Sequence, residues 1–67
     1  MANKLLEERI EASGLKKNFL AGKLGITRQA LANKIDGRNE FTAREIKILC
    51  EELRITSLRE RDTIFFA

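Results

Sequence analysis

Side chains suited to hydrogen-bonded recognition are concentrated near the middle of this 67-residue chain. Gln29 can form two hydrogen bonds with the edge of an adenine, and Arg28 can do the same with a guanine or bind a phosphate. Asn33 follows one helical turn after Gln29. Between Leu15 and Arg38 there are six basic residues and one acid, whereas the whole chain carries a net charge of only +3. This local excess of positive charge indicates a polyanionic partner for the same segment.

The residue types on which most enzymes rely are scarce in this sequence. It contains no histidine, so the commonest general base and metal ligand is missing. The single cysteine, Cys50, lies on a predicted apolar helix face, and we interpret it as a small buried hydrophobe and not as a nucleophile. The carboxylates are spread along helix faces without a pair placed for acid–base work. We therefore expect no enzymatic activity, no cofactor and no metal ion.

Two short helices joined by a tight turn are predicted over residues 17–37, and these helices would position the polar side chains. Gly25 is typical of a helix end, because glycine adopts a left-handed backbone without strain. Thr27 stands where an N-cap is expected for the second helix, which is predicted over residues 28–35. The apolar residues of both helices recur with helical spacing: Leu20, Ala21 and Leu24 in the first, then Leu31 and Ile35 in the second.

One helix is predicted before this segment and another after it. The first spans residues 3–13 and is capped by Asn3. The later helix begins at a capping box formed by Thr42 and Glu45. Apolar side chains at helical spacing give each helix a buried face: Leu5, Leu6 and Ile10 in the first helix, and Ile46, Leu49, Cys50 and Leu53 in the later one.

The C-terminal residues predict a last short helix, which begins after the capping residue Ser57. Leu58, Arg61 and Phe65 are expected to share one face of this helix, and one of the two terminal phenylalanines is expected to close the core. The chain has no proline and is rich in good helix formers. We therefore predict an all-α fold, a compact bundle of about five short helices in a single domain over residues 1–67.

Residues 17–37 resemble the helix-turn-helix of the phage Cro and repressor proteins, also called the XRE family. The resemblance implies a lambda-repressor-like helix-turn-helix domain whose recognition helix, residues 28–35, enters the major groove of DNA. The chain departs from the family at Lys17, where many members carry glutamine, so a plain phosphate-binding charge replaces an amide there. The matching residues are Lys17, Leu20, Ala21, Leu24, Gly25, Ile26, Leu31 and Ile35, followed by Asp36-Gly37.

This mode of docking implies two sets of DNA contacts. Contacts with base edges fall to residues near the start of the recognition helix and one or two turns later: Thr27, Arg28, Gln29, Ala32 and Asn33. Among these, Ala32 offers only a methyl surface, which suits the methyl group of thymine. Contacts with phosphates fall to residues that flank the two helices: Lys17, Asn18, Lys34, Arg38 and Asn39.

The function implied by the resemblance is that of a sequence-specific transcriptional regulator, a small Cro-like repressor of phage or prophage origin. We expect it in the cytoplasm of a bacterial host, at the nucleoid, without membrane association, since no apolar run approaches the roughly 20 residues that span a bilayer. Its expected partner is double-stranded DNA with a palindromic operator, bound as a weak homodimer or as a dimer that forms only on DNA. The expected dimer contacts are Ile48, Phe65 and Phe66.

The alternative is a helical protein-binding modulator, or antirepressor, that keeps the fold and pairs with a larger repressor. The exposed side of residues 28–33 discriminates between the two functions. A protein that reads DNA needs polar hydrogen-bonding groups there, and Arg28, Gln29 and Asn33 supply them. A protein-binding surface would present aromatic or methionine anchors, and this stretch contains none. We therefore favour DNA binding over protein binding.

Overall fold

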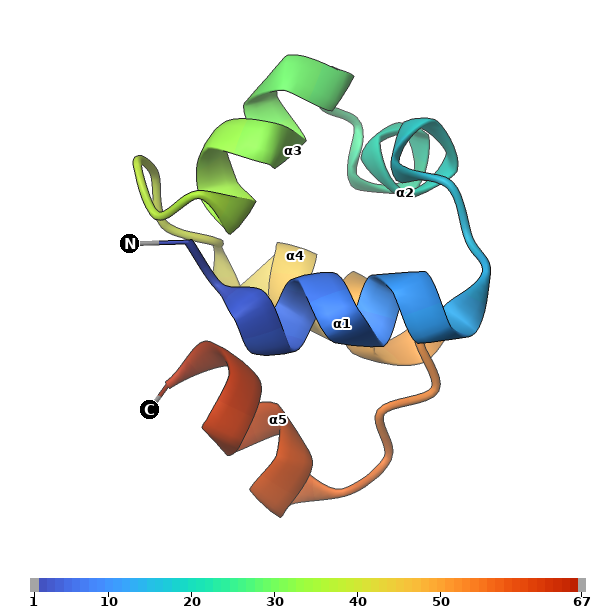
Figure 1. Cartoon of the computed structure of the whole chain (residues 1–67), viewed down its shortest axis with the longest axis vertical. Helices are drawn as coiled ribbons and strands as arrows, with labels where there is room; N and C mark the ends of the chain where they lie inside the picture. Colours follow the sequence, from blue (N-terminus) through green and yellow to red (C-terminus); the bar gives the residue numbers. More distant parts are fainter. Residues whose placement is uncertain (1, 67) are drawn as a thin grey trace.

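The computed structural model describes residues 2–66, and in this part of the chain five α-helices make up all the regular secondary structure. Figure 1 shows α1 across the middle of the molecule, with α4 behind it, α2 and α3 on one side, and α5 on the other. The Cα radius of gyration is 10.7 Å, close to the roughly 11 Å expected for a compact chain of this length. The predicted all-α globule of five helices is confirmed. The helices are α1 (Lys4–Ser13), α2 (Lys17–Leu24), α3 (Arg28–Ile35), α4 (Ala43–Glu52) and α5 (Leu58–Phe65).

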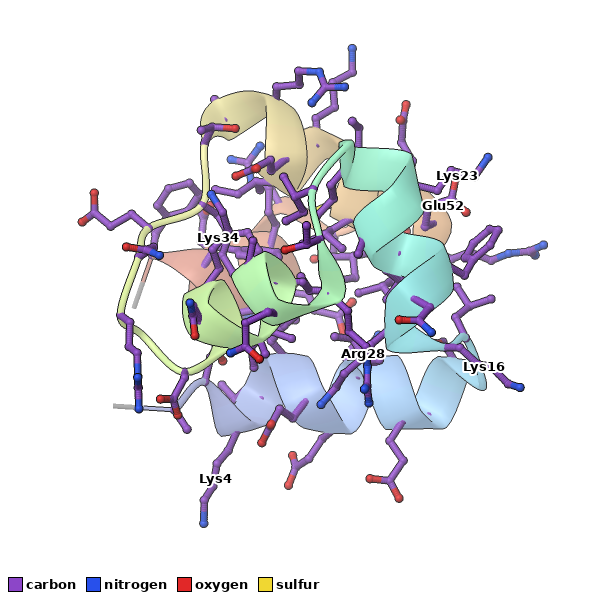
Figure 2. The ribbon with its side chains drawn as sticks, turned by 90° about the horizontal axis from the view of Figure 1, so that it is seen from above. Lys4, Lys16, Lys23, Arg28, Lys34 and Glu52 are labelled. Carbon is purple, nitrogen blue, oxygen red and sulfur yellow. The ribbon has the colours of Figure 1, made fainter. Side chains whose placement is uncertain are left out.

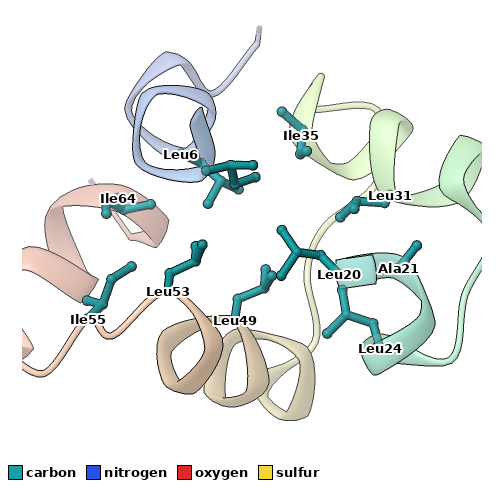
Figure 3. Packing of buried hydrophobic residues seen from close by; sticks show 11 residues of the cluster. Leu6, Leu20, Ala21, Leu24, Leu31, Ile35, Leu49, Leu53, Ile55 and Ile64 are labelled. Carbon is teal, nitrogen blue, oxygen red and sulfur yellow. The ribbon is translucent and has the colours of Figure 1, made fainter. Parts of the chain in front are cut away.

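A single hydrophobic core joins the five helices (Figure 3). Each helix contributes at least one side chain that is buried, because apolar residues spaced three or four apart fall on one face of a helix. The core stripes predicted for the first four helices are confirmed, with Leu5 of α1 as an exception, since 48% of its surface is exposed. Each helix is represented in this core by one of the following residues, in chain order: Leu6, Leu20, Leu31, Leu49 and Ile64.

Asn3 fastens the start of α1 to two other helices. Its side-chain carbonyl oxygen accepts a hydrogen bond from the amide of Leu6, at 3.0 Å, and this confirms the predicted N-cap. Its side-chain nitrogen also donates to the carbonyl oxygen of Ile64 in α5, at 2.8 Å. Its backbone amide donates to the carbonyl oxygen of Ile35 at the end of α3, again at 2.8 Å. One asparagine therefore caps its own helix and ties together α1, α3 and α5.

The C-terminal helix is rotated relative to the prediction. Ile64 is its buried residue, whereas Leu58, predicted on the core face, is 68% exposed. Ile64 lies on the side of α5 that meets the core, and the hydrogen bond from Asn3 to its carbonyl oxygen joins α5 to the start of α1 there. Phe65 packs against the core and meets the ring of Phe41 edge to face, with the ring centres 5.7 Å apart. One terminal phenylalanine thus closes the core, as predicted.

The turn between α2 and α3 is set by Gly25, which has a left-handed backbone with φ of 73°. Its amide donates to the carbonyl oxygen of Gly22 at 3.2 Å, and the amide of Ile26 donates to that of Ala21 at 3.0 Å. These two bonds close the end of α2 in the manner of a Schellman motif. Three residues then suffice to reach the first residue of α3.

Replacing Gly25 with alanine is expected to lower the free energy of unfolding by about 1 kcal/mol, because a side chain disfavours the left-handed backbone. The cost is purely one of backbone conformation, since no heavy atom lies within 4 Å of the added Cβ. Urea denaturation measures the change. Gly22→Ala is the matched control: Gly22 lies inside α2 with open space at its Cβ, so alanine there is expected to add about 0.5–1 kcal/mol. Equal shifts for the two variants would contradict this account of the turn.

Candidate nucleic-acid interface

α3 turns its apolar side inward and its polar side outward. Leu31 and Ile35 are buried in the core, and they fix the rotation of the helix about its axis. The hydroxyl of Thr27 accepts a hydrogen bond from the amide of Ala30 at 3.0 Å, which confirms Thr27 as the N-cap. Arg28 and Gln29 then follow at the exposed start of the helix. The first turn of α3 therefore presents polar side chains on a rigid, capped element.

Two neighbouring side chains at the start of α4 hold the α2 and α3 pair in place. The guanidinium of Arg44 donates to the carbonyl oxygen of Leu24 at the end of α2, at 3.3 Å. The carboxylate of Glu45 accepts a hydrogen bond from the ammonium of Lys34 on α3, at 2.9 Å. The angle between α2 and α3 is therefore fixed by polar contacts as well as by the core.

Five of the ten predicted contact residues surround one open hollow at the junction of α1, α2 and α3. Its volume is about 260 Å³. We call it the α3 hollow, and its lining residues are Glu7, Lys17, Gln29, Ala32, Asn33, Ile35, Asp36 and Arg38.

Within the α3 hollow, two amide side chains are joined to each other. The side-chain nitrogen of Gln29 donates to the side-chain oxygen of Asn33, 3.1 Å away and one turn further along α3. This bond uses one of the two N–H groups of Gln29 and leaves its second N–H and its carbonyl oxygen free. A donor and an acceptor side by side form the pattern that matches the major-groove edge of adenine. The bond to Asn33 thus holds the Gln29 amide in one direction on the outer side of α3.

The charges of the α3 hollow are balanced, and the sequence did not predict this balance. The ammonium of Lys17 lies 3.9 Å from the carboxylate of Glu7, and the guanidinium of Arg38 lies 3.0 Å from that of Asp36. Glu7 comes from α1, so its position beside Lys17 depends on tertiary packing. Both pairs are solvent-exposed, and such pairs contribute little to stability. Lys17 and Arg38 can therefore exchange these partners for a phosphate at low cost.

Arg28 lies outside the hollow, on the side of α3 that faces α1 and α2 (Figure 2). It is exposed, and no side chain among residues 2–66 forms an ion pair or hydrogen bond with its guanidinium. Lys16, the residue before α2, and Lys23, within α2, lie further along the same side of the view (Figure 2). Asn18 is exposed in the first turn of α2.

The structure places Lys34 and Asn39 apart from the other predicted contact residues, around a second hollow on the opposite side of α3. Besides its contact with Glu45, the ammonium of Lys34 donates to the carbonyl oxygen of Glu40, at 3.1 Å. Only 15% of the Lys34 side chain is exposed. The phosphate roles of these two residues stay predictions, and that of Lys34 requires its ammonium to leave Glu45.

Two of the three expected dimer contacts are partly absorbed into the fold. Ile48 and Phe65 are half-buried and pack against the core, whereas Phe66 is 63% exposed. The apolar surface that these residues offer to a second copy is therefore smaller than expected from the sequence.

Cys50 is half-buried against the core, as the sequence predicts for a small hydrophobe. Burial raises the pKa of its thiol, and so the reactive thiolate is scarce at neutral pH. Within residues 2–66, no three His, Cys, Asp or Glu side chains gather in a way that would hold a metal ion. In the same range, every helix is too short or too polar to cross a membrane.

Comparison of the chain with protein-family models, with curated proteins and with solved structures finds no match. The functional interpretation therefore rests on the residues themselves and on their geometry in this five-helix globule.

Proposed function

We propose that this protein is a sequence-specific DNA-binding regulator in which residues 17–37 act as a helix-turn-helix and α3 is the recognition helix. The observation that carries the proposal is the outward polar face of α3, where Gln29 and Asn33 are joined by a hydrogen bond, together with the unpaired Arg28 at the exposed start of the same helix. The same face carries no aromatic or methionine anchor.

The dimensions of α3 suit the major groove. With its side chains an α-helix is about 10–12 Å across, comparable with the groove's width of about 12 Å, and the eight residues of α3 make about two turns. The first turn would meet the base edges, where Gln29 pairs with adenine and Arg28 with guanine or a phosphate. Asn33 and Ala32, one turn later, reach the next bases, with the Ala32 methyl against thymine. Thr27, which is predicted to contact a base, stands immediately before α3, where its hydroxyl caps the amide of Ala30.

The basic residues on the two sides of α3 would contact the two strands that border the groove. Lys17 and Arg38 line the α3 hollow on one side, and Asn18 follows Lys17 in the first turn of α2. Asn39 lies on the other side, and Lys34 beside it would join only if its ammonium left Glu45. Two sets of phosphate ligands that straddle a recognition helix fix its register on the duplex without reading sequence.

We infer that two copies act together on a palindromic operator with half-sites about 34 Å apart. Ile48 and Phe65 are partly used in the core, so we place the pairing on the DNA itself, with only a weak dimer in solution. The resemblance of residues 17–37 to phage Cro and repressor proteins supports a small repressor of phage or prophage origin, acting at the bacterial nucleoid.

Selection of bound duplexes from a random DNA pool at about 150 mM salt tests the proposal directly. We expect enrichment of a palindrome whose half-sites lie one helical turn apart. The triple variant Arg28→Ala, Gln29→Ala, Asn33→Ala is the control, because the three residues lie on the outer side of α3 and their loss spares the core. It is expected to fold and to enrich nothing. Only salt-sensitive background binding by the native protein would overturn the proposal and favour the protein-binding modulator.

Lys17→Ala is expected to weaken binding to all DNA sequences alike and to reduce the slope of log K against log salt concentration by about one unit. The reason is that its ammonium, held only by an exposed 3.9 Å contact with Glu7, would release one counterion from a phosphate. Fluorescence anisotropy at several salt concentrations measures the slope. Lys47→Ala, an exposed cation on α4, is expected to leave the slope unchanged. An unaltered slope for Lys17→Ala would remove Lys17 from the interface.

A further inference from the structure

A further, apolar groove is lined by residues of α4, of the connection after it and of α5. Figure 1 shows α5 on the side of α1 opposite to α3. The volume of the groove is about 540 Å³. Ile46, Cys50 and Ile55 belong to its floor, and the exposed side chains of Leu58 and Phe66 stand at its edge. Neither the core nor the proposed DNA interface uses the exposed side chains of Leu58 and Phe66, and apolar surface with a polar rim is a candidate for an interaction site.

The charged residues that line this groove are mostly basic. Lys47, Arg54 and Arg61 face it together with one acid, Glu51. Among residues 2–66, neither Lys47 nor Arg54 has an ion-pair partner. Arg61 contacts Asp62, and its guanidinium stands 5.8 Å from the ring centre of Phe66. The groove is therefore apolar at its floor and cationic at its rim.

Arg54 occupies a backbone position that favours glycine. Its φ of 57° is left-handed, and no other non-glycine residue among those described shares this feature. The amide of Ile55 donates to the carbonyl oxygen of Cys50 at 2.8 Å, which closes the end of α4 as a Schellman motif. A residue with a side chain costs about 1 kcal/mol at such a position. The left-handed backbone at Arg54 therefore lowers the free energy of unfolding relative to glycine at the same position.

We propose that this groove docks an acidic, amphipathic helical segment of another protein. Apolar side chains spaced three or four residues apart would fill the floor beside Leu58 and Phe66, and carboxylates would meet Lys47 and Arg54. A second copy of the chain is a poorer occupant, because a symmetric contact would bring one cationic rim against another. The neighbouring groove between α1 and α5 lacks this selectivity: its two acids and two bases are balanced, and Arg9 and Glu60 are paired at 3.4 Å.

A library of random 16-residue peptides displayed on phage, selected on the intact protein without DNA, tests the proposal independently of DNA binding. We expect winners with net negative charge and with apolar residues at i and i+3 or i+4. Fluorescence anisotropy of synthesised winners would give their Kd, and amide shifts in NMR spectra would locate the contact. No enrichment, winners without acidic bias, or shifts that map to α3 would each overturn the proposal. So would a stable dimer in sedimentation equilibrium that excludes the peptides.

Variants of exposed residues separate docking from folding. Arg54→Gly and Lys47→Gln are each expected to weaken the winning peptide about threefold, and Leu58→Ser is expected to abolish measurable binding. Arg54→Gly relieves the left-handed backbone, so its melting temperature should be equal or higher, and a loss of binding cannot then be due to unfolding. Lys4→Gln, an exposed cation on α1, is the matched control and should leave Kd unchanged. Equal Kd values for Arg54→Gly, Lys47→Gln and the native protein would refute the cationic rim.

Discussion

Glu45→Gln is expected to lower the free energy of unfolding by about 3 kcal/mol, although the substitution removes only a charge. Glu45 is 5% exposed and its carboxylate lies 2.9 Å from the ammonium of Lys34. Removing the charge of Glu45 leaves the ammonium of Lys34, whose side chain is only 15% exposed, with the Glu40 carbonyl oxygen as its other partner, and the loss of a charged partner at such a site costs up to about 3 kcal/mol. Glutamine can still accept the amide of Thr42, as in other capping boxes. The loss therefore measures the ion pair and spares the helix cap.

Two controls make this prediction specific. The double variant Lys34→Met, Glu45→Gln removes both charges and is expected to recover most of the lost stability, because no unpaired ion remains. Arg38→Met breaks the exposed contact with Asp36, and its effect should stay within about 0.5 kcal/mol. Urea denaturation of the variants at neutral pH gives the comparison. A Glu45→Gln variant as stable as the native protein would show that the contact contributes nothing.

The carboxyl group of Glu45 is also expected to make the stability of the fold depend on acid pH. Burial alone would raise the pKa of Glu45, but the hydrogen bonds from Lys34 and from the Thr42 amide, with the charge of Lys34, together lower it below its ordinary value. A lowered pKa means that ionised Glu45 stabilises the fold at pH values above the ordinary glutamate pKa of about 4.3. This stability is lost as the pH falls through the native pKa. In Glu45→Gln, the part of the acid sensitivity due to this group should disappear.

The five helices could be predicted because their signals are local. Thr42 and Glu45 stand three residues apart, so the capping box is readable from the sequence, and the structure contains both of its hydrogen bonds. Gly25 likewise ends α2 where the apolar stripe stops. Residues 27–33 acquire their outward polar face from the spacing of Leu31 and Ile35 alone. Helix positions and the facing of α3 are therefore consequences of neighbouring residues.

Several features that the sequence did not predict join distant residues. The sequence gives no sign that Lys34 has an ion-pair partner, and the structure places Glu45, eleven residues later, beside its ammonium. The contact of Asn3 with Ile64 spans sixty-one residues, and it joins α5 to the start of α1. Glu7 reached the α3 hollow only through the packing of α1. Such contacts depend on how whole helices meet, and no local pattern encodes them.

Gln29→Ala is expected to weaken binding to the selected operator by about 1–3 kcal/mol, a factor of roughly 5–150, and to relax the base preference at one position of each half-site. Alanine removes the donor and acceptor that Gln29 presents beside Asn33. Because Gln29 is exposed, the free energy of unfolding should change by less than about 0.5 kcal/mol. Anisotropy titrations with the operator and with its single-base variants measure affinity and preference together.

A double-mutant cycle tests whether Asn33 acts by orienting Gln29. If the 3.1 Å hydrogen bond between them sets the direction of the Gln29 amide, Asn33→Ala should also relax the preference at the base that Gln29 reads. The double variant should then lose less than the sum of the two single losses, with a coupling of at least about 0.5 kcal/mol. Thr63→Ala, at an exposed position on α5, should leave operator binding unchanged. Strict additivity of the two losses would mean that Asn33 and Gln29 contact DNA independently. Unchanged affinity in both single variants and in the double variant would mean that residues outside α3 read the DNA sequence.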